Sequence, residues 1–339
     1  MKKTKKISIV IPAYKVDDYI EKCIRSLENQ DLPKEDYEII VTNDGSPDRC
    51  QEIVELLQLE FPNIILINQE NQGVSMARNN AIAIANGDYI LPIDPDDYVL
   101  PNVLHEVYQN ASSRNLDVLY LAYEIFDAKG NSVWETKYED KTNQIFDGFN
   151  GYFAPRGVKI KDPDRSWAIL YRREILQQYN VKYPKNVPFL EDGLFLGKVF
   201  TVANRVGFMT DKFYQRTTRL GSATNSRLLF SKEALNGFLL AVNDLRSFSK
   251  TIPNDKNQKR LINHVTAKFV FLPLTVCLQS KNFSNFLKIV SSLKKQGLKK
   301  IDLDGCAEIY LRYGKAYNKS IVHFVCLYYR LIFNIKYNR

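Results

Sequence analysis

The sequence predicts an α/β fold in which a mostly parallel sheet is flanked by helices, with a helical region appended at the C-terminal end. Strand-like and helix-like patterns alternate from residue 7 to residue 93, and such alternation favours right-handed crossovers and parallel pairing. Charge is also uneven along the chain. Residues 1–226 hold 27 basic and 32 acidic side chains, whereas residues 227–339 hold 20 and 6, a balance of +14.

The first two strands and helices are predicted from the spacing of apolar residues. Residues 7–11 form a β-branched run that is closed by Pro12, and apolar positions from 16 to 27 recur at helical intervals. Residues 37–41 repeat the strand pattern, and residues 53–61 repeat the helical one. The sequence therefore predicts strand, helix, strand and helix over this part of the chain.

A third strand is predicted at residues 63–67, a third helix at 72–86 and a fourth strand at 89–93. We expect this helix to end at Gly87, where a left-handed residue costs little. The apolar side chains expected on its inner face are Val74, Ala77, Ala81, Ile84 and Ala85.

Three carboxylates, Asp94, Asp96 and Asp97, follow the fourth strand in a turn stiffened by proline. Ligands of such sheets sit at the carboxyl ends of the strands, so the loops after residues 11, 41 and 93 should converge. Carboxylate oxygens suit Mg²⁺ or Mn²⁺, and one or two Asp ligands leave positions for substrate phosphates. The turn therefore predicts a divalent cation with a nucleoside diphosphate, although an Asp-x-Asp considered alone is more often a solvated turn.

Six sequence blocks together resemble the inverting family 2 glycosyltransferases, which have the GT-A fold. The blocks are ISIVIPAY, VTNDGSPD, NQGVSMARNNAIAIANGDYI, PIDPDD, PFLEDGLF and RTTRLGSAT, in this order over about two thirds of the chain. The resemblance implies a nucleotide-sugar-binding half at residues 1–112 and an acceptor-binding half at 113–226. A basic helical C-terminal region follows at 227–339.

The resemblance implies how the nucleotide is held. The loop after the first strand walls the nucleobase, with the Tyr14 ring facing a pyrimidine, while Asp44 reads the base edge and Arg78 reaches the base or the phosphates. In this part of the site Lys15 replaces the usual Asn, and Asn43, a common variant, stands for the first Asp of an Asp-Asp pair. The nucleotide-binding residues implied are Pro12, Ala13, Tyr14, Asp44, Arg78 and, on the ribose, Asp94.

The resemblance also places the metal, Mn²⁺ or Mg²⁺, on Asp96, with Asp97 capping or supporting the loop. A cation there stabilises the negative charge that develops on a departing diphosphate. Purely structural roles stay open as alternatives for other residues of the implied site. Ser46 or Asp48 can cap a helix, and Arg78 can form a surface salt bridge.

Glu191 and Asp192 precede an apolar helical pattern, and by themselves they read as an ordinary helix cap. The resemblance implies a general base here, Asp192 in the first place and Glu191 in reserve, that deprotonates the acceptor hydroxyl. One base and direct displacement imply inversion at the anomeric carbon.

Two further elements complete the implied site. Arg216, Arg219 and Ser222 resemble a terminal lid that clasps the diphosphate, since Arg makes bidentate contacts with phosphate oxygens. A solvated basic loop is the alternative. Trp167, in WAILYRRE, is the candidate stacking wall of the acceptor pocket, although a Trp on a strand is as often part of the core.

Helical spacing in the basic region predicts helices at residues 228–250, 257–279, 282–295 and 307–337. In the last one Lys319, His323, Arg330 and Asn334 share one stripe, and most other side chains from 321 to 335 are apolar. Such a helix can lie in the interface of an anionic membrane, or it can pack on the catalytic domain or on a second subunit of a homodimer.

The implied function is transfer of a sugar, hexosyl or N-acetylhexosaminyl, from a nucleotide donor to a hydroxyl of a glycan or lipid-linked acceptor. A UDP-sugar is favoured because an Asp facing the base accepts the N3–H of uracil, and capsule, lipopolysaccharide and teichoic-type glycans are all compatible products. One alternative, a sugar nucleotidyltransferase, would carry a Gly-rich phosphate loop where this chain has PAYK. A non-catalytic glycan- or nucleic-acid-binding protein would leave Asp94, Asp96 and Asp192 unexplained, so we expect no nucleic acid partner.

The expected location is the cytoplasm, and membrane binding by the last helix would place the protein at the inner face of the cell membrane. Five cysteines, an odd number, are scattered without metal-ligand spacing, as is typical of a reducing compartment. The lysines before residue 7 imitate the start of a signal peptide, but the apolar run lasts five residues before Pro12 and reads as a strand.

Overall fold

The computed structural model describes residues 4–156, 164–217 and 231–337, with side chains up to residue 333. Internal contacts divide the chain into two compact units, one of Met1–Lys185 with Val202–Ser222 and one of Asn186–Thr201 with Ala223–Arg339. The two predicted halves at 1–112 and 113–226 share one unit, because one sheet runs through both. Residues 186–201, which we expected in the acceptor-binding half, belong to the helical unit. The predicted boundary at 226 lies outside the described residues.

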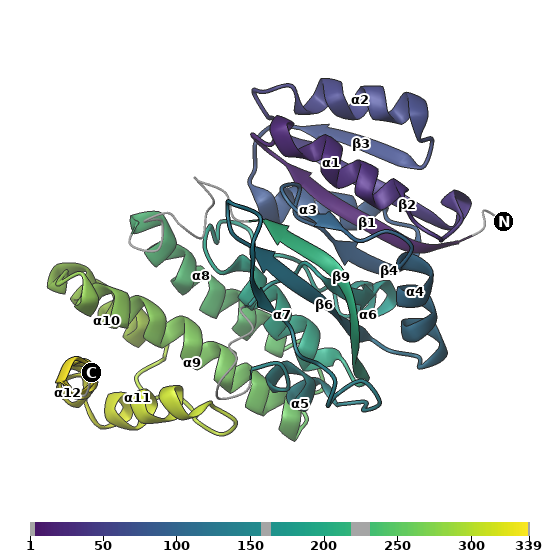
Figure 1. Ribbon diagram of the computed structural model, residues 1–339. Helices are drawn as coiled ribbons and strands as arrows, with labels where there is room; N and C mark the ends of the chain where they lie inside the picture. Colours follow the sequence, from purple (N-terminus) through teal and green to yellow (C-terminus); the bar gives the residue numbers. More distant parts are fainter. Residues whose placement is uncertain (1–3, 157–163, 218–230, 338–339) are drawn as a thin grey trace. The chain divides into compact units, whose positions relative to one another are not determined.

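The first unit is built on one nine-stranded sheet in the order β3-β2-β1-β4-β8-β6-β9-β5, with β7 beside β6 (Figure 1). Its strands are β1 (Lys5–Ala13), β2 (Tyr37–Asp44), β3 (Ile64–Gln69), β4 (Gly87–Pro92), β5 (Tyr98–Val99), β6 (Val118–Phe126), β7 (Ser132–Glu135), β8 (Ile169–Arg172) and β9 (Val206–Thr217). Its helices are α1 (Asp17–Glu28), α2 (Cys50–Glu60), α3 (Val74–Ile84), α4 (Leu104–Ser113), α5 (Gly148–Phe153) and α6 (Arg173–Gln178), with a 3₁₀ turn at Lys34–Asp36.

Strand directions confirm the predicted α/β fold and refine it. The pairs β3–β2, β2–β1, β1–β4 and β6–β9 are parallel, and the pairs that involve β5, β7 and β8 are antiparallel. The strand order 3-2-1-4 with right-handed crossovers places α1 and α2 on one face of the sheet and α3 on the other (Figure 1). Pairing is thus parallel among β1, β2, β3 and β4, whereas β5 and the strands after residue 113 add antiparallel pairs.

The inner face of α3 differs from the prediction. Ala77 and Ala81 are buried as expected, but Val74 and Ile84 are 37% and 44% exposed. Arg78, a charged residue, is buried instead at 3% exposure. Hydrophobic spacing misses this face because an ion pair between the buried Arg78 and Asp94 takes the place of an aliphatic contact.

The sequence predicted that Gly87 ends α3, but Gly87 is instead the first residue of β4. A Cβ at this position would lie 2.4 Å from the backbone N of Ser8, so the close approach of β4 to β1 requires glycine. The N–H of Gly87 donates to Ser8 Oγ at 2.7 Å. The glycine therefore serves the packing of the sheet rather than the end of the helix.

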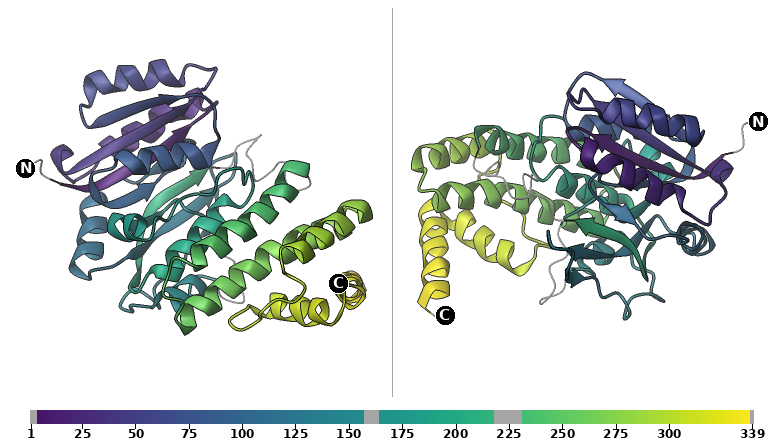
Figure 2. Two further views of the ribbon diagram at one scale, coloured as in Figure 1. Left: turned by 180° about the vertical axis from the view of Figure 1, so that it is seen from behind. Right: turned by 45° about the horizontal axis from the view of Figure 1, so that its top comes forward.

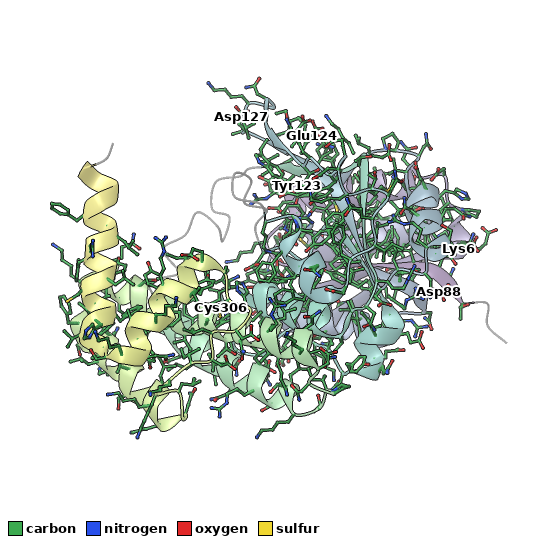
Figure 3. The ribbon with its side chains drawn as sticks, turned by 90° about the horizontal axis from the view of Figure 1, so that it is seen from below. Lys6, Asp88, Tyr123, Glu124, Asp127 and Cys306 are labelled. Carbon is green, nitrogen blue, oxygen red and sulfur yellow. The ribbon has the colours of Figure 1, made fainter. Side chains whose placement is uncertain are left out.

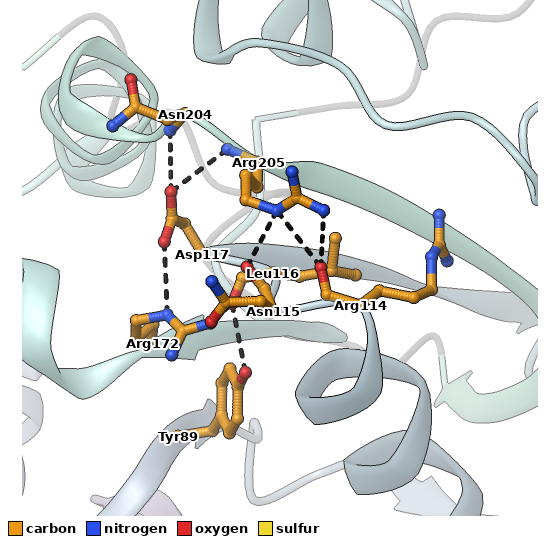
Figure 4. Close-up of polar contacts among 8 residues, drawn as sticks. All are labelled: Tyr89, Arg114, Asn115, Leu116, Asp117, Arg172, Asn204 and Arg205. Carbon is orange, nitrogen blue, oxygen red and sulfur yellow. Dashed lines mark hydrogen bonds and ion pairs between the residues drawn. The ribbon is translucent and has the colours of Figure 1, made fainter.

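At the sheet edge remote from the aspartates, the carboxylate of Asp117 joins β6, β8 and β9 (Figure 4). Its Oδ2 accepts the backbone N–H groups of Asn204 and Arg205 at 2.8 and 3.1 Å. Its Oδ1 accepts Nε–H of Arg172 at 3.2 Å. The largely buried carboxylate of Asp117 thus accepts three hydrogen bonds, one from the end of β8 and two from the residues directly before β9.

We expect Asp117→Asn to destabilise this unit by about 2–3 kcal/mol, since the substitution removes charge-assisted bonds and turns an NH₂ group toward donors. For a unit of this size that is roughly a 5–10 °C lower Tm in thermal unfolding. Asp127→Asn is the matched control. Its carboxylate accepts N–H groups of Lys129 and Asn131 at the tip of the β6–β7 hairpin, where Asn fits equally well (Figure 3). If both variants melt together, the account of Asp117 is wrong.

The second unit is helical, with α7 (Glu191–Val202), α8 (Lys232–Ser249), α9 (Lys256–Gln279), α10 (Phe283–Lys295), α11 (Glu308–Lys319) and α12 (Ile321–Tyr337). Helix α9 packs against α8, α10 and α11, and α11 packs against α12 (Figure 2). Within the described residues α9 is long and apolar enough to span a membrane, but 78% of its most apolar window is buried, as in a core helix.

The single helix predicted over residues 307–337 is two helices. Ser320 interrupts it with extended backbone, φ −169° and ψ 162°. Its hydroxyl then accepts the N–H of His323 at 3.2 Å, so that Ser320 starts α12. Apolar spacing continues through this break, which explains why the sequence pattern did not mark it.

Candidate active site

The carboxyl ends of three parallel strands meet at one edge of the sheet. In the β1–β2 pair Ala13 lies opposite Asn43, and in the β1–β4 pair Val10 lies opposite Pro92. The loops that follow these strands therefore leave from the same edge, which confirms the predicted convergence.

The loop after β4, residues 93–97, is called the aspartate loop below. Oxygens of Asp94, Asp96 and Asp97 all lie within 4.8 Å of one another. Asp97 is buried while the other two are partly exposed. Burial first, and then the charges of Asp94 and Asp96, raise the pKa of Asp97 well above its usual value. Hard oxygen donors gathered so closely fit Mg²⁺ or Mn²⁺, with Asp94 and Asp96 as the partly exposed pair, and a cation would relieve the mutual repulsion of the three carboxylates.

Arg78 on α3 pairs with Asp94 inside the unit. Its Nη2 lies 2.7 Å from Asp94 Oδ1, and its side chain is only 4% exposed. The guanidinium also lies 5.2 Å from the centre of the Tyr183 ring. Arg78 therefore forms a salt bridge, as the alternative interpretation stated, but its side chain is buried rather than at the surface. The ion pair holds the Asp94 side of the aspartate loop.

Asp44, at the end of β2, is 3% exposed and ties two loops together. Its Oδ1 accepts Nε2–H of Gln69 and the backbone N–H of Gln72, both at 2.7 Å. Its Oδ2 accepts the N–H of Gly73 at 2.8 Å, directly before α3. Asp44 thus holds the start of the helix that carries Arg78, and its contact with a nucleobase stays a prediction.

Of the three residues expected to wall the base, Pro12 and Ala13 are buried in β1, and Tyr14 is 42% exposed. Lys15 has a left-handed φ of 55°, a conformation in which the Asn usual at this position is better tolerated. The N–H of Lys15 donates to Ser46 Oγ at 2.7 Å and links the loops after β1 and β2. Tyr14 is therefore the exposed member of this group, and Nζ of Lys15 lies 5.3 Å from the centre of its ring.

The capping alternative is right for Asp48. Its carboxylate accepts the N–H groups of Cys50 at 3.2 Å and Asp17 at 3.0 Å, at the starts of α2 and α1, and the Ser46 hydroxyl at 2.6 Å. Burial alone would raise the pKa of Asp48, but these hydrogen bonds outweigh it and lower the pKa.

Trp167 is not an open wall for a sugar, and this prediction is corrected. The side chain is 6% exposed and stacks on Tyr214, with centroids 4.8 Å apart and ring planes 18° apart. Tyr123 meets it edge-on at 4.8 Å. The WAILYRRE pattern was compatible with an acceptor wall and with a core position. The contacts of Trp167 with Tyr214 and Tyr123 show that it belongs to the core.

Of the predicted lid, Arg216 lies within the described residues and has its guanidinium 5.6 Å from the centre of the Trp167 ring. Arg219 and Ser222 lie outside the described residues. The diphosphate role of all three stays a prediction.

Glu191 and Asp192 form the first turn of α7 in the second unit, and both are partly exposed. Leu190, directly before them, has a φ of 61°, which is strained for a branched side chain. In the described chain four residues other than Asn and Gly have a left-handed φ, and three of them, Lys15, Ala168 and Leu190, adjoin predicted site residues. Strain of this kind concentrates at functional sites.

Sequence reasoning missed Tyr214 and Thr217, both of which hydrogen-bond to Asp97. Both lie on β9, more than one hundred residues after the aspartate loop. The residues next to them in the sequence do not indicate a contact with Asp97, because the contact arises from the pairing of β9 with β5.

Comparison with known proteins gives a consistent result. A family model described as glycosyl transferase family 2 matches residues 8–179. The uncharacterized glycosyltransferase EpsJ of Bacillus subtilis (strain 168) is 32% identical, over 61% of this chain and 60% of its own length. A poly(ribitol-phosphate) beta-glucosyltransferase of Bacillus spizizenii is 31% identical, over 62% of this chain and 32% of its own. The chain thus spans between about a third and 60% of these relatives.

Solved structures share the fold at lower identity. The structure of Staphylococcus aureus TarS 1–349 in complex with UDP-GlcNAc has a TM-score of 0.61 and 19% identity, covering 86% of this chain and 92% of TarS 1–349. The mannosyltransferase PcManGT from Pyrobaculum calidifontis, in complex with GDP-Man and Mn²⁺, has a TM-score of 0.53 and 12% identity, covering 99% and 88%. These likenesses concern the arrangement of the chain alone.

Proposed function

The chain belongs to glycosyl transferase family 2, and from this premise we propose that it is a metal-dependent, inverting glycosyltransferase with a UDP-sugar donor. The observation that carries the proposal is the aspartate loop, in which three carboxylates gather at the shared edge of β1, β2 and β4, with Asp94 held by Arg78. Solved neighbours with UDP-GlcNAc and with GDP-Man and Mn²⁺ support a nucleotide donor and a divalent metal.

In the proposed complex the base lies against Tyr14 and near Asp44, the ribose on Asp94 and the metal on Asp96. When bound, Mn²⁺ or Mg²⁺ stabilises the charge that develops on the leaving diphosphate. Asp192 takes the proton of the acceptor hydroxyl as the acceptor oxygen forms its bond to the anomeric carbon. The bond between that carbon and the diphosphate breaks on the opposite side, so the configuration inverts and the nucleoside diphosphate leaves with the electron pair.

The proposed acceptor is a hydroxyl of a glycan or lipid-linked glycan in the synthesis of a cell-surface polysaccharide such as capsule or wall polymer. Relatives described as poly(ribitol-phosphate) glucosyl- and N-acetylglucosaminyltransferases support this class, as well as a hexosyl or N-acetylhexosaminyl donor. The test is release of nucleoside diphosphate from a panel of UDP-, GDP- and CDP-sugars, with and without Mn²⁺. Metal-dependent release from UDP-sugars is expected, and release from none of the panel would contradict the proposal.

We also propose that the protein works in the cytoplasm at the inner membrane face, bound peripherally through α12. From residue 321 to 333 the buried side chains are Phe324 and Tyr328, while Val322 and Phe333 are 66% and 58% exposed. With 17 residues α12 is about 25 Å long, short of the roughly 30 Å of a bilayer core, so it would lie in the interface. The +14 balance after residue 226 attracts anionic lipid and opposes pairing with a second copy.

Vesicle sedimentation at low salt tests this attachment. The wild type should bind vesicles rich in anionic phosphatidylglycerol, and the double substitution Val322→Ser with Phe333→Ser should weaken binding at least about tenfold, since two apolar side chains no longer enter the lipid. The control is Leu56→Ser with Leu59→Ser on α2, where the side chains are 67% and 85% exposed. No vesicle binding by the wild type, or a dimer that the α12 variant dissociates, would contradict membrane attachment.

A further inference from the structure

The last residues of β9 hold the aspartate loop at several points. The hydroxyl of Tyr214 donates to Asp97 Oδ2 and accepts the backbone N–H of Asp94 at 3.3 Å. The N–H of Thr217 donates to Asp97 Oδ1 at 2.8 Å, and its hydroxyl donates to the carbonyl oxygen of Asp96. The loop is thus bonded to β9 at both ends and in the middle.

These hydrogen bonds give Asp97 a different role from Asp94 and Asp96. Both oxygens of Asp97 accept hydrogen bonds from β9, so Asp97 serves as the anchor of the loop. By contrast, β9 contacts Asp94 and Asp96 through their backbone atoms. These two bonds fix the backbone from which the carboxylates of Asp94 and Asp96 project. A ribose-binding and a metal-binding residue both require such a fixed backbone.

An aromatic layer fixes Tyr214 in turn. Its ring stacks on Trp167, whose other neighbours include the guanidinium of Arg165 at 4.9 Å from the ring centre. Arg165 is 1% exposed and donates to the carbonyl oxygens of Trp167 and Ala168. Burial, and then the neighbouring Asp97, raise the pKa of Tyr214 well above its usual value, so the hydroxyl keeps its proton and remains a donor.

We propose that Tyr214, backed by Trp167 and assisted by Thr217, is a positioning residue that sets the geometry of Asp94 and Asp96 for the metal-nucleotide complex. The inference rests on the proposed function. Trp167, expected at the acceptor, acts on the donor side through Tyr214. Bonds that orient a metal ligand typically change metal affinity 10–100-fold when they are removed.

Tyr214→Phe tests the inference, because it deletes the hydroxyl and keeps the stack on Trp167. We expect Mn²⁺-supported UDP binding to weaken at least about tenfold in calorimetric titration. UDP binding without metal, which involves Asp94 but no metal on Asp96, should weaken less. Tyr89→Phe is the matched control. It removes a buried hydroxyl that donates to Leu116 O at 3.2 Å, at the opposite edge of the same sheet. Equal metal-supported affinities for the two variants would overturn the inference.

Thr217 supplies a second, milder test. Thr217→Val removes the bond to the Asp96 carbonyl and should weaken Mn²⁺-supported UDP binding severalfold, whereas Thr217→Ser retains the hydroxyl and should behave as wild type. If Val and Ser variants bind alike, β9 does not set the loop. Failure of the proposed function looks different, because the wild type itself would then show no metal-supported UDP binding.

Discussion

Asp96→Asn should abolish the Mn²⁺-supported part of UDP binding and lower the rate of sugar transfer by about 10³-fold. The substitution keeps the shape of the side chain but removes the negative charge that would hold the metal. A metal that stabilises charge on the departing diphosphate contributes several kcal/mol to the transition state, and each 1.4 kcal/mol corresponds to tenfold in rate. Donor binding without metal should change little, since Tyr14, Asp44 and Arg78 are untouched.

The matched control is Asp88→Asn. Asp88 lies on β4, the same strand that leads into the aspartate loop, but at its exposed start, where it accepts the hydroxyl of Tyr108 at 3.3 Å (Figure 3). This variant should retain both metal-supported binding and turnover. Should Asp96→Asn bind UDP with Mn²⁺ as the wild type does, the metal is held elsewhere and the assignment of Asp96 is wrong.

Asp192→Asn should lower transfer to the acceptor by about 10²–10⁴-fold, the usual contribution of a general base, and leave metal-supported donor binding intact. The base acts on the acceptor hydroxyl, so its loss appears in the rate of the chemical step. Because Asp192 lies in the first turn of α7, where a carboxylate also favours the helix dipole, thermal unfolding must show that the variant is folded.

Glu191→Gln is the neighbouring control for Asp192. The two residues share the first turn of α7, so both substitutions remove one negative charge from the same helix start. A small loss for Glu191→Gln and a large one for Asp192→Asn is the expected order. The reverse order would transfer the role of base to Glu191, and equal small losses would exclude both.

Local patterns predicted the parts of the site that are close in sequence. A β-branched run that ends in a polar turn defines a strand and its carboxyl end, and parallel order then brings Tyr14, Asp44 and Asp94 to one edge. The three aspartates follow β4 directly, so their proximity is a property of one short turn. The strand pattern of residues 89–93 was therefore sufficient to place them.

Contacts between distant segments could not be predicted in this way. Tyr214 and Thr217 reach the aspartate loop through strand pairing over more than one hundred residues, and Trp167 is buried by the ring that this pairing brings beside it. Gly87 likewise resembles a helix cap in the sequence. In the structure a Cβ at this position would lie 2.4 Å from the backbone N of Ser8, so the glycine serves sheet packing. In each case the neighbour across the sheet, absent from the local pattern, decides the role.

Calorimetric titration of UDP, GDP and CDP into the wild-type protein, each with and without Mn²⁺, tests the proposed donor site most directly. We expect UDP to bind most tightly and Mn²⁺ to strengthen its binding at least about tenfold, because Asp96 would hold a metal that offsets the charge of the diphosphate. Binding of none of the three nucleotides, with or without the metal, would contradict the proposed donor site and with it the assignment of the aspartate loop.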